Sequence, residues 1–254
     1  MQAPTNRFRH AALVAVPLLT LLGIFIVDPI PQSLAYHVLA DARACWGIPN
    51  FLNVVSNIPF LVVGGLGFLF CLGRQHPTLR TTWATFFLGV ALVCVGSAYY
   101  HWQPGNSTLV WDRLPMTVAF MALTTAVVAE HVGESVDRYL LAPALAIGVA
   151  AVLWWQYSDD LRLYIWVQAT PLIIVPLLLW LYPARYSHRY ELLYALGFYL
   201  LAKIFEFYDQ ELYRLTGETV SGHTLKHLLA AVSTYWIYRM LYRRQIIVTR
   251  PTHR

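Results

Sequence analysis

Long apolar stretches separated by short polar segments run through most of the sequence. A membrane-spanning helix needs about 20 consecutive, mostly apolar residues, and windows of that size predict a series of spans. Their approximate ranges are 11–27, 51–73, 82–101, 109–131, 139–156, 161–182, 190–208 and 222–242. The pattern therefore predicts an all-α fold, a polytopic transmembrane bundle with a seven-helix core and one extra N-terminal helix.

The composition supports a membrane protein over a soluble one. Of the 254 residues, 58% are hydrophobic and 12% are charged, whereas soluble domains usually carry about 25% charged residues. The mean hydropathy is +0.52. Because no polar linker is long enough to separate two domains, we expect an N-terminal helix with an outer loop (1–49), a single helical core (50–242) and a basic cytoplasmic tail (243–254).

The arginines predict the orientation, because cytoplasmic loops of membrane proteins are enriched in Lys and Arg. Eight spans put both ends of the chain on one side, and most arginines fall there: Arg7, Arg9, Arg74, Arg80, Arg138, Arg185, Arg189, Arg239, Arg243, Arg244, Arg250 and Arg254. The other side has Arg43, Arg113, Arg162 and Arg214. We expect a multi-pass protein of a bacterial inner membrane with both termini cytoplasmic. A first span cleaved as a signal peptide at the small-residue site Ala40-Asp41-Ala42 is the alternative, and it would not reorient the other spans.

The charge distribution argues against a nucleic-acid-binding protein, and the cysteine spacing argues against a protein built on disulfides or thiolate metal sites. The formal net charge is +5, but the arginines form no basic stripe, so nucleic acid is not expected as a partner. Cys45, Cys71 and Cys94 are far apart and show no C-x-x-C spacing, so neither a disulfide framework nor a thiolate metal site is predicted.

Three histidines are predicted to lie at one depth of the membrane, near the outer face. His101 ends the third predicted span, and His223 and His227 open the eighth. Asp112 opens the fourth span at the same depth, and Ser97 lies one helical turn before His101. The other histidines are expected to be solvated in tails, loops or span ends: His10, His37, His76, His131, His188 and His253.

The spacing of these histidines suits a metal ion. His223 and His227 are four residues apart, so they lie on one face of a helix and can bind the same ion. A third histidine from another helix gives three protein ligands with one position free, which is the arrangement of a catalytic zinc site. The alternative is a set of buried histidines hydrogen-bonded to their neighbours. It is less favoured because polar side chains within the membrane are costly to bury.

Four sequence motifs resemble those of the alkaline ceramidase family. They are Gly96-Ser97-x-x-x-His101, Asp112-x-Leu114-Pro115-Met116, the pair His223-x-x-x-His227 and Asn53-x-x-Ser56-Asn57. The family belongs to a group of seven-helix membrane hydrolases that includes the adiponectin-receptor type. The resemblance implies a zinc-dependent amidohydrolase that cleaves ceramide or a related N-acyl lipid to a long-chain base and a fatty acid.

Carried over to this sequence, the resemblance implies Zn²⁺ ligands at His101, His223 and His227, with the catalytic residues Ser97 and Asp112 beside the activated water. For Ser97 the alternative is a small residue that lets helices approach; for Asp112 the alternatives are a helix N-cap or an acceptor that orients a zinc histidine. Residues considered as possible supporting groups are Asn53, Ser56, Asn57, Tyr164, Glu206, Asp209 and Lys226. Of these, Lys226 is expected to pair with Glu206 or Asp209.

Two departures from animal members of the family leave the substrate open. The stretch from Asp41 to Asn50 holds one carboxylate and Arg43, where those members carry an acidic calcium-binding stretch. Calcium takes six to eight oxygen ligands, so no calcium site is predicted. Arg113 follows Asp112, where animal relatives tend to have an acid. We expect a membrane lipid as substrate and infer no protein partner; the alternatives are a receptor or signalling protein with a structural zinc and a proton or solute transporter.

Overall fold

A computed structural model describes residues 5–73 and 78–247, and these residues form α-helices, short 3-10 helices and isolated β-bridges, without a strand. The all-α prediction is confirmed for this part of the chain. Several positions considered above lie outside the described residues: Arg74, His76, Arg250, His253 and Arg254, with most of the tail 243–254.

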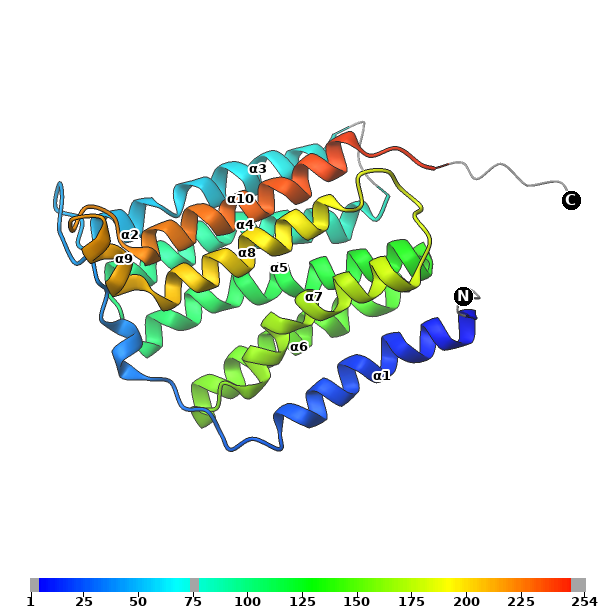
Figure 1. Cartoon of the computed structure of the whole chain (residues 1–254), viewed down its shortest axis with the longest axis horizontal. Helices are drawn as coiled ribbons and strands as arrows, with labels where there is room; N and C mark the ends of the chain where they lie inside the picture. Colours follow the sequence, from blue (N-terminus) through cyan, green and yellow to red (C-terminus); the bar gives the residue numbers. More distant parts are fainter. Residues whose placement is uncertain (1–4, 74–77, 248–254) are drawn as a thin grey trace, which may run out of the picture.

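Eight long helices make up the bundle, each over one predicted span. They are α1 (Asn6–Ile24), α3 (Ile58–Leu72), α4 (Arg80–Trp102), α5 (Asn106–Val132), α6 (Asp137–Ser158), α7 (Arg162–Leu181), α8 (Glu191–Phe207) and α10 (Gly222–Arg243). Within the described residues, 6 helical segments are long and apolar enough to cross a membrane. The other two long helices, α8 and α10, run alongside them in the bundle (Figure 1).

The arrangement puts α1 at the edge and α5 in the middle (Figure 1). Helix α5 packs against α4, α6 and α7, and α10 packs against α8 and α3. Helix α1 contacts α7 and buries none of its residues. The start of α1 and the end of α10 lie at the same end of the bundle (Figure 1). The opposite end, where α4 finishes and α10 begins, is called the site end below.

The second predicted span is not one continuous helix, which corrects the prediction. The chain forms α2 (Phe51–Val55), breaks at Ser56 and Asn57, and resumes as α3. Pro59 stands at the second position of α3, where its missing N–H costs no helical hydrogen bond. The side chains at the break bond to the preceding turn instead: the Asn57 amide nitrogen donates to the Asn53 carbonyl at 2.8 Å. A short helix, α9 (Asp209–Leu215), was also not predicted.

Two expectations about single residues are contradicted by the structure. His37 is not a solvated histidine, because its ring nitrogens lie 3.0 Å from the Tyr100 hydroxyl and 2.8 Å from the Asn106 side-chain oxygen. Asp112 is not a helix N-cap, because α5 begins at Asn106. Arg113 lies in α5, within the span predicted over 109–131, and it is buried.

Glycines allow the helices of the site to approach closely. A Cβ atom on Gly96 would overlap the Trp111 carbonyl, with the carbonyl carbon at 2.7 Å, so α4 and α5 touch through their backbones. A Cβ on Gly222 would overlap the Phe205 carbonyl in α8. Small residues favour such contacts between membrane helices. The two glycines directly precede Ser97 and His223, and they therefore bring the candidate residues near one another.

The adjacent glycines of α3 provide a test of this packing. A Cβ on Gly64 would overlap the α4 backbone, with Ala91 Cα at 2.8 Å, whereas one on Gly65 would meet nothing within 4 Å. Gly64→Ala should destabilise the fold by about 1–3 kcal/mol through overpacking, and Gly65→Ala should be neutral or stabilising because Ala favours the helix. Thermal unfolding in detergent measures the difference. Equal unfolding temperatures for the two variants would contradict the close packing of α3 on α4.

Candidate metal centre

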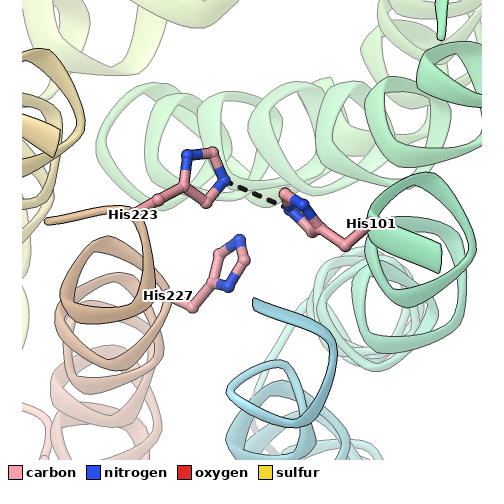
Figure 2. Close-up of side chains that lie close together, drawn as sticks. All are labelled: His101, His223 and His227. Carbon is pink, nitrogen blue, oxygen red and sulfur yellow. Dashed lines mark hydrogen bonds between the residues drawn. The ribbon is translucent and has the colours of Figure 1, made fainter. Parts of the chain in front are cut away.

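Three histidine rings converge at the site end of the bundle. One ligand nitrogen from each of His101, His223 and His227 lies within 4.8 Å of the other two, and all three residues are buried. The centroids of the His101 and His223 rings are 4.6 Å apart, and each lies 4.9 Å from that of His227. Figure 2 shows His101 reaching in from α4 and the other two from α10. The helix ends predicted from the sequence thus bring these three residues together.

The start of α10 is fixed by short polar contacts. The Ser221 hydroxyl oxygen accepts a hydrogen bond from the Thr224 N–H at 3.1 Å, as N-cap serines commonly do. An oxygen of the Asp209 carboxylate accepts from the backbone N–H of His223 at 2.7 Å. Asp209 therefore positions the backbone of a histidine rather than lining the cavity. Its second oxygen accepts from the Ala40 N–H at 3.1 Å.

The hydrogen-bonding capacity of the histidines fits a shared cation. Nε2 of His223 lies 3.1 Å from Nε2 of His101 and 2.8 Å from the ammonium of Lys226. A neutral imidazole nitrogen has a single lone pair, so it cannot accept from both neighbours. Nε2 of His227 and Nδ1 of His101 are buried without a partner. A metal ion among the three rings would take up lone pairs that the protein leaves without a donor.

The break between α2 and α3 places Ser56 beside one of the histidines. Its hydroxyl oxygen lies 2.7 Å from Nδ1 of His227, which turns the other ring nitrogen toward the cluster. Asn53 is fully buried, and its side-chain oxygen accepts from the Ser221 and Thr224 hydroxyls at 3.4 and 3.2 Å. Asn57 bonds only within its own segment, and its side-chain oxygen is buried without a partner. The Asn-x-x-Ser-Asn motif thus attaches α2 to the start of α10.

Ser97 and Asp112 face the same space from neighbouring helices. Ser97 comes from α4 and Asp112 from α5, and both side chains are buried. They line a cavity of about 220 Å³ together with His227. A reacting group in this cavity would therefore meet a carboxylate, a hydroxyl and an imidazole at once.

Charged side chains from α8 and α10 complete the polar wall of the cavity. The ammonium of Lys226 lies 3.0 Å from the Glu206 carboxylate, which also pairs with Lys203 and accepts from the Tyr36 hydroxyl at 3.0 Å. Tyr164 lines the cavity as well. The sequence spacing of three between Lys203 and Glu206 is consistent with this pairing. Tyr36 was not among the candidates from the sequence, because a tyrosine in a loop gives no signal of a site.

The loop between α1 and α2, residues 25–50 and called the N-terminal loop below, covers this end of the bundle. Arg162 anchors it by donating to the Val27 carbonyl at 2.8 Å. The same guanidinium hydrogen-bonds the Asp160 carboxylate and lowers its pKa to about 2. Further along, Arg43 pairs with Asp41 at 2.8 Å and donates to the Thr219 carbonyl at 2.7 Å. The loop is therefore attached both to α7 and to the segment before α10.

Comparison with known families decides the classification. The family model described as ceramidase matches residues 44–202, more than half of the chain. The chain belongs to the ceramidase family. Membership confirms the suspected resemblance to ceramidases and supports a hydrolase that acts on amide bonds. The matched ceramidase region includes Ser97, His101 and Asp112 and ends before α10. A search of the curated proteins finds no match to this sequence.

The contact between Ser56 and His227 gives a test of the metal centre. Partners that orient a metal-binding histidine typically contribute 10–100-fold to affinity, so Ser56→Ala should weaken zinc binding by about that factor. Competition with a chromophoric chelator measures the affinity of the purified protein. Ser233→Ala is the matched control, because Ser233 is buried in α10 and bonds the Ala195 carbonyl at 2.7 Å, away from the cluster. Unchanged zinc affinity in Ser56→Ala would contradict a positioning role.

Proposed function

We propose that this member of the ceramidase family is a zinc-dependent hydrolase that cleaves the amide bond of a membrane N-acyl lipid, ceramide or a relative of it. The convergence of His101, His223 and His227 beside a polar cavity carries the proposal. We further propose eight membrane spans, a catalytic core over 50–242, both termini in the cytoplasm and the site near the outer face. The arginine distribution supports this orientation.

The shape of the cavity system supports a lipid substrate. An apolar cavity of about 100 Å³ adjoins the polar one and shares Phe60, Val93, Met116, Tyr199 and Ala230 with it. It extends between the helices toward residues such as Val90 and Ile237. An amphipathic amide fits this arrangement, because its acyl chain can occupy the apolar part while the amide lies beside Ser97 and Asp112.

The three histidines would hold the metal ion, and a zinc ion with three protein ligands and a free position activates water and polarises a carbonyl. Asp112 can accept the proton that a water molecule loses as it attacks the amide carbon. It can then return that proton to the amine as the C–N bond breaks, acting as general base and then as general acid. The burial of its carboxylate keeps bulk water from competing for the proton.

Ser97 lies where it can stabilise the charge that develops during the attack. Its hydroxyl can donate to the oxygen of the former carbonyl, as donors in oxyanion holes do. Gly96 holds this stretch of α4 against the α5 backbone, so the hydroxyl and the Asp112 carboxylate are kept on the same side of the substrate. Lys226 and Glu206 neutralise each other on the opposite helices and keep the wall polar.

The ligand set favours an enzyme over a receptor with a structural zinc. Structural zinc sites usually have four protein ligands, whereas catalytic sites have three. In the part of the chain that the structure describes, the cluster consists of three histidines and no further His, Cys, Asp or Glu joins it.

Removal of one histidine should abolish both metal binding and turnover. His227→Ala leaves two ligands, so zinc content should fall well below one ion per chain and amide hydrolysis should be lost. His10→Ala is the control, because His10 is exposed in α1. Zinc content by elemental analysis and fatty-acid release from a panel of N-acyl lipids, with and without a chelator, provide the measurements. Full zinc and full activity in His227→Ala would exclude the assignment.

Asp112→Asn separates proton transfer from metal binding. The amide keeps the shape of the carboxylate but cannot take a proton, so kcat should fall by about 10²–10⁴-fold while zinc is retained. Asp28→Asn, at an exposed position in the N-terminal loop, should leave both unchanged. If zinc affinity fell in parallel with kcat, Asp112 would instead orient a metal ligand.

A further inference from the structure

Arg113 is a buried cation on the wall of the polar cavity, and the proposed chemistry does not use it. Its exposed fraction is 5%. The guanidinium carbon lies 4.0 Å from the centre of the Trp155 ring and 4.6 Å from that of Tyr164. One terminal nitrogen, Nη2, donates to the Gln32 side-chain oxygen at 2.6 Å. The other, Nη1, is buried without a hydrogen-bond partner.

No carboxylate of the described residues pairs with Arg113, although Asp112 precedes it. Arg244 gives a comparison, because its side chain is also buried, lies on the ring of Tyr186 and likewise has one terminal nitrogen, Nη2, without a hydrogen-bond partner. Arg244 has an acidic partner, Glu130, at 2.6 Å. A buried charge without a partner is costly, and an arginine cannot lose its proton to avoid the cost. An anion that enters the cavity would remove this penalty.

The other charges on the cavity wall do not neutralise Arg113. The wall carries Arg113, Lys203 and Lys226 against Asp112 and Glu206. Glu206 already pairs with both lysines and accepts from Tyr36. The cavity is therefore positive overall before any metal cation is added. An anionic group on the substrate would compensate that charge, which the hydroxyl groups of neutral ceramide would not. Among the N-acyl lipids proposed above, the charge therefore favours acidic relatives of ceramide.

We propose that the substrate is an acidic N-acyl lipid, with a carboxylate, phosphate or sulfonate on its amine half, and that Arg113 binds this anion. The inference rests on the proposed function, since it names the substrate class of the same site. The apolar cavity takes the acyl chain, so the wall formed by Arg113 and Gln32 faces the amine half. The planar guanidinium, held between two rings with free N–H groups, is suited to an oxyanion.

A matched pair of ligands tests the proposal. N-dodecanoylglycine and N-dodecanoylethanolamine have the same acyl chain and the same amide. The first carries a carboxylate where the second carries a neutral hydroxymethyl group. Binding to the zinc-loaded full chain in detergent is measured by competition with a fluorescent lipid, and hydrolysis by release of dodecanoate. We expect the wild type to bind the acylglycine at least about tenfold more tightly and to show the same preference in kcat/KM.

Substitution of Arg113 should remove this preference without removing the site. Arg113→Gln should bind both ligands with the affinity of the neutral one, and Arg113→Lys should keep part of the preference because it keeps the charge but not the planar fork. Arg189→Gln is the control: this arginine also lies over a tyrosine ring, at 4.8 Å, and donates to the Tyr182 carbonyl far from the cavity. It should behave as the wild type. Binding of the neutral ligand reports that each variant is folded.

Equal binding of the two ligands by the wild type would overturn the proposal, and so would an unchanged preference in Arg113→Gln. A third contrary result would be that the only change in Arg113→Gln is a loss of inhibition by the product dodecanoate. The last result would assign the anion to the fatty-acid product and not to the substrate. Failure of the proposed function gives a different pattern, in which neither amide is hydrolysed by the zinc-loaded wild type while the binding preference remains.

Discussion

A polar group inside an apolar helix bundle has to find its partner within the protein, because hydrocarbon supplies no hydrogen bonds. At the site end most groups have such a partner, as in the pairs of Lys226 with Glu206 and Ser56 with His227. Some do not, and three of the residues concerned line one cavity: His227, Arg113 and Tyr199, whose Nε2, Nη1 and hydroxyl have no partner. Atoms left without a partner in one place point to a ligand that supplies it. In the proposals above, a metal cation supplies the partner of His227, and an anionic group of the substrate supplies the partner of Arg113.

The geometry of the site depends on backbone contacts more than on the polar residues themselves. Gly96 lets α4 touch α5, and Gly222 lets α10 touch α8. Each glycine is followed by a residue of the site, Ser97 or His223, so the close contact fixes the position of that side chain. A side chain at either glycine would push its helix away from the neighbouring helix. The histidines come from the end of α4 and the start of α10, so they would move as well. The polar cluster and the packing are therefore one structural unit.

Much of this arrangement could be predicted from the sequence, because hydropathy locates helices and alternating direction locates their ends. His101, His223 and His227 were expected to meet for that reason, and they do. The break after Val55 was missed, because Ser56, Asn57 and Pro59 were included in one span, as membrane helices tolerate such residues. The contact between Ser56 and His227 depends on that break and could not be seen. Arg113 was counted among the charges of the outer side, and nothing in the sequence indicated that its guanidinium lies over the rings of Trp155 and Tyr164.

The N-terminal loop bears on specificity as much as the helices do. Gln32 and Tyr36 line the polar cavity and contact Arg113 and Glu206, yet both precede the region matched by the ceramidase family, which begins at residue 44. The matched region contains Ser97, His101 and Asp112, the groups nearest the proposed chemistry. The residues that would meet the amine half of a substrate thus come partly from a segment outside the family match. The cleaved bond can be a property of the family while the preferred headgroup is a property of this chain.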